Sequence, residues 1–185
     1  MEVLRGRMTC LAGPSGAGKT TLFRTLIGVK DYDGQILFDG KELRELKSRE
    51  LFASAGIVFQ NPSNQFITQN VLAEVMAGMP AQKKDSADAK ARAKSHLEDF
   101  RLQHFAQYSP YMLSQGQQRR LAVLGVLASA KKLLILDEPT YGQDEGMTRL
   151  IMEILRKKVE NEGLTVLFST HDRHLIENWA DDIYL

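Results

Sequence analysis

The chain of 185 residues contains a single cysteine, Cys10, and almost no excess charge. One cysteine excludes an internal disulfide framework and a cysteine-rich zinc site, which fits a reducing compartment, and we expect Cys10 to be a small core residue. The 24 Lys and Arg residues nearly balance the 23 Asp and Glu residues. The charge therefore indicates neither a disordered chain nor a basic surface for nucleic acid.

Long apolar runs are also missing. The longest occupies residues 121–130, which is about half of the roughly 20 residues needed to cross a bilayer. Residues 1–7 lack the apolar stretch of a secretory signal, so we expect a cytosolic chain. The length fits one domain with an inserted lobe, at roughly 100 to 200 residues per domain.

Short apolar runs alternate with helical patterns along the chain. Runs of the kind that form strands lie at residues 8–12, 35–38, 55–59, 133–136 and 165–168. Helical periodicity occupies residues 20–27 and 147–162, and Gly163 ends the second helix. This alternation predicts an α/β fold with a mostly parallel sheet.

Residues 71–130 have a helical pattern, interrupted by the polar stretch 80–88, which we interpret as an exposed connection between helices. We therefore divide the single domain into two parts. Residues 1–60 and 131–185 are predicted to form the core with a partial β-subdomain, and residues 61–130 an inserted helical subdomain.

A glycine-rich segment between the first strand and helix matches the P-loop template at each fixed position. It consists of Gly13, Pro14, Ser15, Gly16, Ala17, Gly18, Lys19 and Thr20. Glycines let successive N–H groups point at phosphate oxygens, and the helix adds its positive dipole end. Lys19 is predicted to bridge the β- and γ-phosphates and Thr20 to bind Mg²⁺, and Thr21 is included in the predicted nucleotide site. Strand and helix on either side disfavour a chance glycine-rich turn.

The apolar run 133–136 delivers Asp137 and Glu138 at its carboxyl end, where ligands of open α/β sheets collect. Asp137 is predicted to hold Mg²⁺, and Glu138 to reach a water in line with the γ-phosphate. Alone, such a pair would be a solvated turn. Only together with the P-loop does it indicate a metal site and a catalytic base.

Two more motifs complete a family pattern. Residues 113–117 read Leu-Ser-Gln-Gly-Gln before an apolar helix, and Ser169-Thr170-His171 follows the last apolar run. With the P-loop and the Asp-Glu strand, in this order, the chain resembles the nucleotide-binding subunit of ATP-binding cassette (ABC) transporters. The resemblance covers nearly the whole chain and implies a P-loop NTPase (RecA-like) core with an inserted helical subdomain. It also implies ATP and Mg²⁺ as ligands.

By this resemblance, Ser114, Gly116 and Gln117 look like the signature motif, which grips the γ-phosphate of ATP held by the other subunit of a dimer. Gln115 stands where the family usually has glycine. The alternative for Ser114 is a helix N-cap, and both roles can hold at once.

Three further residues take their expected roles from the same resemblance. Gln60 looks like the Q-loop glutamine that senses Mg²⁺ and the attacking water. Asp144 occupies the place of the D-loop aspartate, although the family more often has Ser-Ala-Leu-Asp there. His171 looks like the switch histidine that contacts the γ-phosphate and helps to position Glu138. The remaining histidines are expected to be structural: His96, His104 and His174.

Residues 59–66 and 138–144 resemble those of energy-coupling factor (ECF) ATPases, which drive vitamin and metal-ion uptake. This implies two partners: a second ABC ATPase, identical or not, and a transmembrane coupling protein at the cytoplasmic face of the membrane. The surface at residues 62–69 would accept a coupling helix in a groove. The alternative is an ordinary loop before a helix.

We therefore expect an ATP hydrolase that energises import from a peripheral position on the cell membrane. A non-catalytic nucleotide-binding module is the first alternative, which the retention of Lys19, Asp137, Glu138 and His171 disfavours. A DNA-associated ABC ATPase is the second. The stretch between Gln60 and the signature motif is short and has no heptad run or cysteine pair, so no nucleic-acid partner is expected.

The resemblance is incomplete at both ends. The leading strands and the aromatic residue that stacks on adenine have no counterpart before Met8, and the chain ends within the expected next strand. These differences imply a shortened chain that holds the base loosely, with little preference for ATP over GTP.

Overall fold

The computed structural model describes residues 1–80 and 87–185. Most of the polar stretch predicted to connect two helices, at residues 80–88, lies outside the described residues. No helix in the described part of the chain combines the length and apolar character that a bilayer crossing requires.

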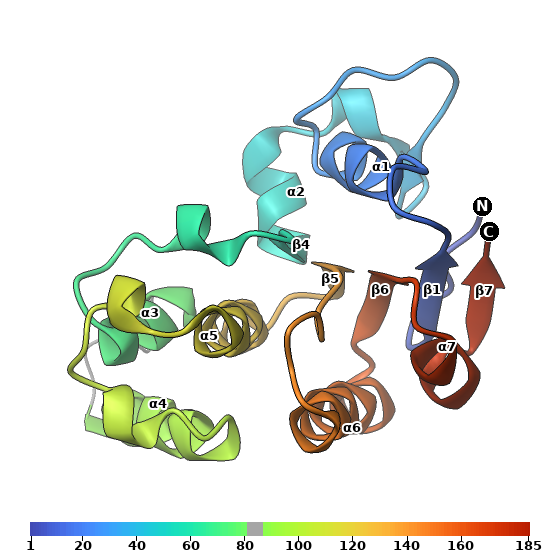
Figure 1. Cartoon of the computed structure of the whole chain (residues 1–185). Helices are drawn as coiled ribbons and strands as arrows, with labels where there is room; N and C mark the ends of the chain where they lie inside the picture. Colours follow the sequence, from blue (N-terminus) through green and yellow to red (C-terminus); the bar gives the residue numbers. More distant parts are fainter. Residues whose placement is uncertain (81–86) are drawn as a thin grey trace.

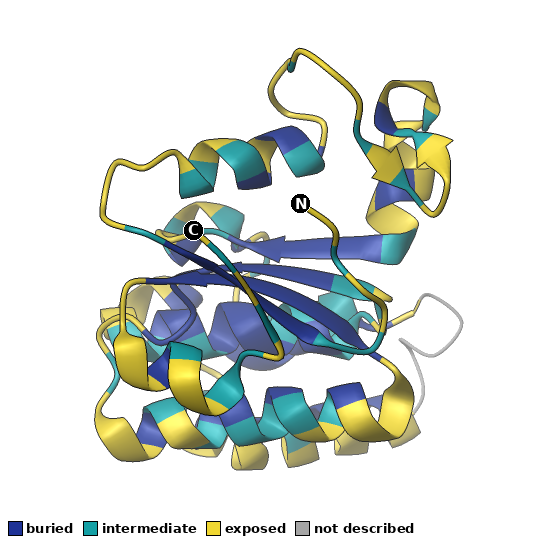
Figure 2. Cartoon of the chain, turned by 90° about the vertical axis from the view of Figure 1, so that its right-hand side faces the viewer, coloured by how far each residue is buried: buried dark blue, intermediate teal, exposed yellow. Residues whose placement is uncertain are grey.

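Five parallel strands form the central sheet, in the order β4-β5-β6-β1-β7 (Figure 1). The strands are β1 (Met8–Ala12), β4 (Ala55–Val58), β5 (Leu133–Asp137), β6 (Thr165–Thr170) and β7 (Asp182–Tyr184). All residues of β1, β4 and β6 are buried, whereas the edge strand β7 is partly exposed (Figure 2). Strands buried on both faces have continuous apolar sequences, which is why the sequence pattern located them.

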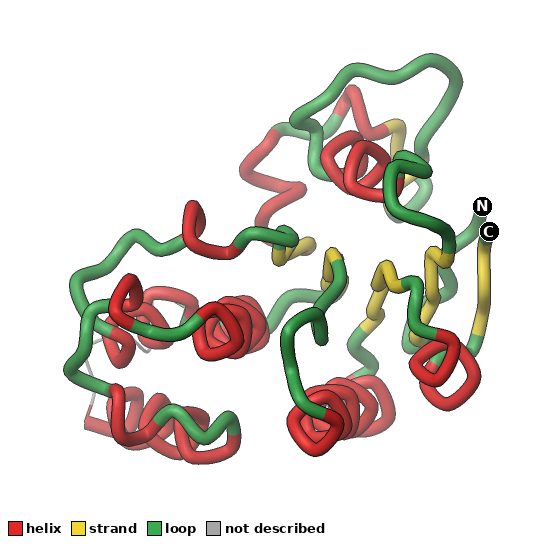
Figure 3. The backbone as a smooth tube through the Cα atoms, in the orientation of Figure 1, coloured by secondary structure: helices red, strands yellow, loops and turns green. Residues whose placement is uncertain are grey.

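Helices cover both faces of the sheet (Figures 1 and 3). On one face lie α1 (Lys19–Leu26) and α2 (Ser48–Ser54), and on the other α5 (Gln115–Ala128), α6 (Glu145–Glu162) and α7 (Arg173–Trp179). Alternate strand residues point to opposite faces. Ile57, Ile135 and Leu167 therefore pack with Phe23 of α1, while Val58, Leu134 and Val166 belong to the core between the sheet and the helices α5 and α6.

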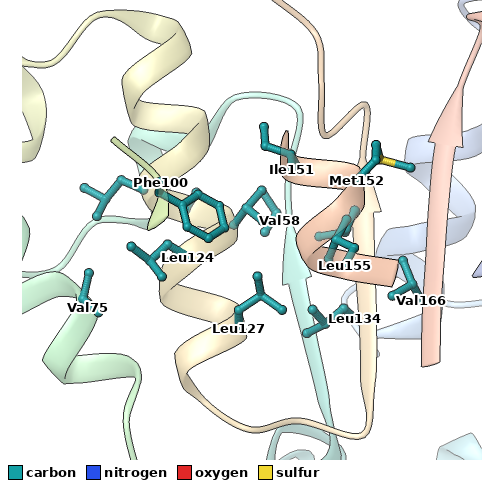
Figure 4. Close-up of a cluster of buried hydrophobic side chains, with 14 of the residues drawn as sticks. Val58, Val75, Phe100, Leu124, Leu127, Leu134, Ile151, Met152, Leu155 and Val166 are labelled. Atoms are coloured by element: carbon teal, nitrogen blue, oxygen red, sulfur yellow. The ribbon is translucent and has the colours of Figure 1, made fainter. Parts of the chain in front are cut away.

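The helices α3 (Val71–Gly78), α4 (Ala87–Asp99) and α5 pack against one another beside the β4 end of the sheet (Figure 1). One continuous apolar cluster joins them to the sheet and to α6. Figure 4 shows members of it: Val58, Val75, Phe100, Leu124, Leu127, Leu134, Ile151, Met152, Leu155 and Val166. The helical group and the sheet thus share a core.

Several local predictions need correction. The stretch 71–130 is not helical up to α5, because residues 100–114 hold only the 3₁₀ turns η4 (Gln103–Phe105) and η5 (Pro110–Met112). Helices α2 and α7 were not predicted. The strand expected at 35–38 shortens to β2 (Leu37–Phe38), which forms a hairpin with β3 (Lys41–Glu42). Among the described residues, the other short 3₁₀ turns are η1 (Leu43–Glu45) and η2 (Pro62–Gln65).

The ends of α6 follow from its capping residues. The side chain of Asp144 accepts a hydrogen bond from the backbone N–H of Met147 (2.8 Å), which starts the helix two residues before the predicted Met147. At the other end Gly163 adopts the left-handed conformation (φ 67°) that ends helices, as predicted.

Cys10 is fully buried in the main core, which confirms the expectation of a core residue. Burial raises the pKa of its thiol to about 12, and the nearby carboxylate of Glu138 acts in the same direction.

The crossing of α3 and α5 generates a stability prediction. In Gly78→Ala the new Cβ would lie 2.2 Å from the carbonyl oxygen of Gly125, so the helices must separate. We expect a loss of about 1–3 kcal/mol in the free energy of unfolding. Gly125→Ala is the matched control, because its Cβ would meet no atom within 4 Å and alanine favours helix by up to ~1 kcal/mol. Urea unfolding of both variants measures the difference, and equal stabilities would contradict the close crossing.

Candidate functional site

The parallel strands bring the predicted site residues to one edge of the sheet. Ala12 pairs with Thr170, Asp137 with Ser169 and Val58 with Leu136. The chain segments that follow β1, β4, β5 and β6 therefore all leave at the same edge, which we call the carboxyl edge. These segments carry the P-loop, Gln60, Glu138 and His171.

The P-loop forms a turn that exposes backbone N–H groups. Gly16 (φ 85°) and Gly18 (φ 94°) adopt left-handed conformations that side chains disfavour. Helix α1 begins directly after Gly18 and has no side-chain cap, so its first N–H groups remain available to an anion. The Lys19 ammonium donates hydrogen bonds to the carbonyl oxygens of Gly13 (2.6 Å) and Pro14 (2.9 Å). Backbone donors and a cation therefore surround one exposed position, as phosphate binding requires.

Asp137 is almost completely buried and is held by two hydroxyl groups. Its Oδ2 accepts a hydrogen bond from Thr20 Oγ1 (2.6 Å), and its Oδ1 accepts one from Ser169 Oγ (2.7 Å). Hydroxyl and carboxylate oxygens are ligands that Mg²⁺ prefers. Among the described residues, no group of three or more His, Cys, Asp or Glu side chains could hold a metal ion. Thr20 and Asp137 thus fit a Mg²⁺ ion that takes the rest of its ligands from other groups, such as phosphates and water.

Glu138 and His171 form a pair beside this position. Nδ1 of His171 lies 2.8 Å from Oε1 of Glu138, and the Glu138 side chain is only 10% exposed whereas that of His171 is 56% exposed. Glu138 has a left-handed backbone (φ 52°), which is strained for a residue with a side chain. Its N–H donates to Ser169 Oγ (3.1 Å). The geometry suits a carboxylate base whose direction is set by an imidazole and by its own backbone.

The motif residues of α5 lie at the start of that helix. Ser114 Oγ accepts from the N–H of Gln117 (3.3 Å), and Gln117 Oε1 accepts from the N–H of Ser114 (2.9 Å), which forms a capping box. The structure therefore confirms the N-cap reading of Ser114. The carbonyl of Gly116 accepts from Gln143 Nε2 (3.0 Å), and a Cβ on Gly116 would lie 3.1 Å from that atom. Within the described part of the chain, no hydrogen bond joins these residues to the P-loop.

The other predicted site residues have identified positions. Gln60 is exposed, and its carbonyl oxygen accepts a hydrogen bond from Arg119. Asp144 caps α6 with its side chain, and Thr21 is exposed on α1. The three histidines expected to be structural lie on other segments: His96 on α4, His104 on η4 and His174 on α7.

Two residues at the carboxyl edge were not predicted. Ser169 bridges Asp137 and Glu138, as described above. Arg119 of α5 is 5% exposed, and its guanidinium donates to the carbonyl oxygens of Asp137 (3.3 Å), Glu138 and Gln60. Burial lowers the pKa of Arg119, and the carboxylates of Glu138 and Asp137 oppose this effect. The available signal for Arg119 was an arginine pair directly before an apolar helix.

Comparison with known proteins identifies relatives of one kind, ATP-binding proteins of transporters. A protein-family model described as "ABC transporter" matches residues 1–141. An ATP-binding protein of Bacillus subtilis, YkoD, provisionally assigned to HMP/thiamine import, is 40% identical over 179 residues, which are 96% of this chain and 32% of that protein. The energy-coupling factor transporter ATP-binding protein EcfA of Methanosphaera stadtmanae is 37% identical over 181 residues, 96% of this chain and 65% of that protein. The chain spans between 30% and 66% of the length of the first curated relatives that it matches.

Solved structures of similar fold include cbiO1 from Clostridium perfringens, described as part of the ABC transporter complex cbiONQ. It is 33% identical with a TM-score of 0.80, over 100% of this chain and 74% of that chain. The ATP-binding cassette MJ0796, in a dimeric post-hydrolysis state bound to ADP and Pi, is 28% identical with a TM-score of 0.84, over 99% of this chain and 82% of that chain.

The hydrogen bonds of Ser169 generate the next prediction. Ser169→Ala leaves the N–H of Glu138 and Oδ1 of Asp137 without this partner, which should lower the free energy of unfolding by about 1–3 kcal/mol. Thr9→Val is the matched control, since Thr9 is equally buried in the neighbouring strand and its hydroxyl has no hydrogen-bond partner among the described residues. The control should be as stable as the original chain or more so. Urea unfolding tests both, and a greater loss for Thr9→Val would overturn this view of the hydroxyls.

Proposed function

The chain belongs to the ABC transporter family, and from this premise we propose that it is an ATPase that energises import through a membrane transporter of the ECF type. In this proposal it binds and hydrolyses Mg-ATP at the carboxyl edge of its sheet. It works with a second ATPase subunit and a transmembrane coupling protein, at the cytoplasmic face of the membrane.

One observation carries the catalytic part of the proposal. A phosphate-binding loop with its lysine and a histidine-paired glutamate lie at the same edge of one sheet, and Asp137 connects them through Thr20 and Ser169. Phosphoryl transfer depends mostly on positioning and on electrostatic stabilisation, and these groups supply both.

Each residue has a role in this chemistry. The backbone N–H groups of the P-loop and Lys19 bind the phosphates, while Thr20, Asp137 and the side chain of Gln60 would provide oxygen ligands for Mg²⁺. When bound, Mg²⁺ supplies positive charge that the phosphate oxygens require during transfer. Water attacks the γ-phosphorus, the bond to the β–γ bridging oxygen breaks, and ADP leaves with that electron pair. Glu138 accepts a proton from the attacking water, and His171 orients the Glu138 carboxylate.

A second ATPase subunit is part of the proposal because the first signature residue is exposed and lies away from this chain's own P-loop contacts. Ser114 is exposed at the start of α5, where the positive end of the helix dipole favours an anion, although the capping box already occupies the N–H groups of Ser114 and Gln117. The similar cassette MJ0796 is dimeric in its ADP- and Pi-bound structure. Ser114, Gly116, Gln117 and Asp144 are therefore assigned to the ATP bound by the partner subunit.

The transport part of the proposal is supported by the relatives and by one surface. Relatives are named for the energy-coupling factor transporter, and cbiO1 is described as part of a transporter complex. Ile67 is 83% exposed in the predicted contact segment, and Tyr111 and Met112 are 60% and 72% exposed. The hydroxyl of Tyr111 donates to the carbonyl of Phe66, which places Tyr111 beside the segment that carries Ile67. An exposed apolar surface of this kind marks a site of protein interaction.

We expect Glu138→Gln to lower the hydrolysis rate at least 100-fold and to leave ATP binding within threefold, because it removes the base but retains shape and phosphate contacts. Lys19→Ala should instead weaken ATP binding at least tenfold, because it removes a charge-assisted contact to phosphate. Phosphate release gives the rate and titration calorimetry the affinity. If both variants lost affinity equally and hydrolysed at the original rate when saturated, the two roles would be wrong.

Ser114→Asp tests the second subunit. Aspartate is as good an N-cap as serine, so the fold should remain, but its charge would face the partner's phosphates. In the Glu138→Gln background, we expect ATP to produce dimers, and Ser114→Asp to reduce the dimer association constant at least tenfold. Ser95→Asp, an exposed serine on α4, is the control. Sedimentation with and without ATP measures association, and dimers unaffected by Ser114→Asp would count against the proposal.

A further inference from the structure

Arg119 is a buried cation that the proposed chemistry does not use. It lies on α5, five residues after Ser114, and is 5% exposed. Ionised groups are rarely buried unless specific partners replace the lost water. In the described part of the chain its guanidinium has three hydrogen-bond acceptors, and all are backbone carbonyls: those of Gln60, Asp137 and Glu138.

We propose that Arg119 is a positioning residue for hydrolysis. It fixes the backbone at Glu138 and at Gln60 together. The side chains of both residues are thereby directed at the γ-phosphate and the attacking water. This inference rests on the proposed function. It adds to the residues that support hydrolysis one that lies outside the P-loop, the Asp-Glu pair and His171. Arg119 connects α5, the helix capped by Ser114, with the segments that carry Gln60 and Glu138.

The backbone of Glu138 shows why such a residue is needed. Its left-handed conformation (φ 52°) is unfavourable for a residue with a side chain and persists only where the surroundings determine it. Ser169 holds the N–H of Glu138, and Arg119 holds its carbonyl oxygen, which also accepts from the N–H of Tyr141 (3.1 Å). Both ends of the strained residue are therefore fixed by hydrogen bonds, and the direction of its carboxylate depends on them.

The planar guanidinium suits this task better than an ammonium. It carries several N–H donors in a fixed fork and can reach carbonyls from two loops at once, whereas a lysine ammonium is a single flexible point of charge. The Arg119 guanidinium also lies 5.6 Å from the ring centroid of Tyr141, which limits its orientation. Lysine at this position would keep the positive charge but lose the simultaneous contact with Gln60 and Glu138.

The test uses Arg119→Lys and Arg119→Met in the otherwise unchanged chain. Arg92→Lys and Arg92→Met are matched controls on α4, where Arg92 forms an exposed ion pair with Asp88. We expect Arg119→Lys to lower kcat about 10- to 100-fold, the effect of a small misplacement of catalytic groups. KM for ATP and the Kd of ADP should change less than threefold, because the P-loop is not touched. The controls should match the original chain within twofold.

If Arg119 had a structural role alone, its substitution would lower the amount of folded protein, which urea unfolding measures. It would not lower kcat of the folded protein while leaving KM unchanged. The double variant Arg119→Lys with Glu138→Gln gives a further distinction. If Arg119 acts through Glu138, single-turnover hydrolysis in the double variant should be within threefold of Glu138→Gln alone, since groups that act as a unit are not additive.

Three results would overturn the inference: an Arg119→Lys rate within twofold of the original, multiplicative effects in the double variant, or failure of both Arg119 variants to fold. The last result would assign Arg119 to stability alone. Failure of the proposed function has a different signature, because the original chain would then not hydrolyse ATP, or Glu138→Gln would leave hydrolysis unchanged.

Discussion

The carboxylate of Asp137 ties three separate segments of the chain together at the carboxyl edge. Its oxygens accept from Thr20 on α1 and from Ser169 on β6, and the side chain itself ends β5. With only 1% of its surface exposed, it cannot exchange these partners for water without cost. The P-loop helix and the two strands therefore hold one arrangement, and Glu138, the next residue, takes its place from that arrangement.

The predictability of each element depended on how much of it is buried. Strands such as β1 and β6 are buried on both faces, and their continuous apolar sequences located them. Helices α2 and α7 each bury one residue, Leu51 and Leu175, and a single buried position creates no period for a sequence pattern to show. The turns of residues 100–114 escaped prediction because they bury apolar residues such as Leu102 and Leu113 without regular spacing.

The site followed a related rule. The P-loop binds phosphate through consecutive backbone groups, so a run of consecutive residues in the sequence was enough to predict its function. Arg119 and Ser169 act through partners up to 59 and 32 positions away, and nothing local distinguished Arg119 from the neighbouring Arg120. Two roles were predicted for Ser114, and the structure of a single chain can show only one of them, the helix N-cap. Its assignment to a partner's nucleotide, like that of Asp144, concerns a second molecule and stays a prediction.

Burial of Cys10 makes this thiol a reporter of opening of the main core around β1. With a pKa of about 12 and no exposed surface, it is neither ionised at neutral pH nor accessible to an alkylating reagent while β1 remains in the sheet. The strand is second from the β7 edge of the sheet, and the thiol faces the main core, so it becomes reactive only when the elements that cover it move away. The rate of Cys10 alkylation therefore measures how often the core around β1 opens, and ligands that bind the adjacent P-loop should slow it to the extent that they stabilise this region.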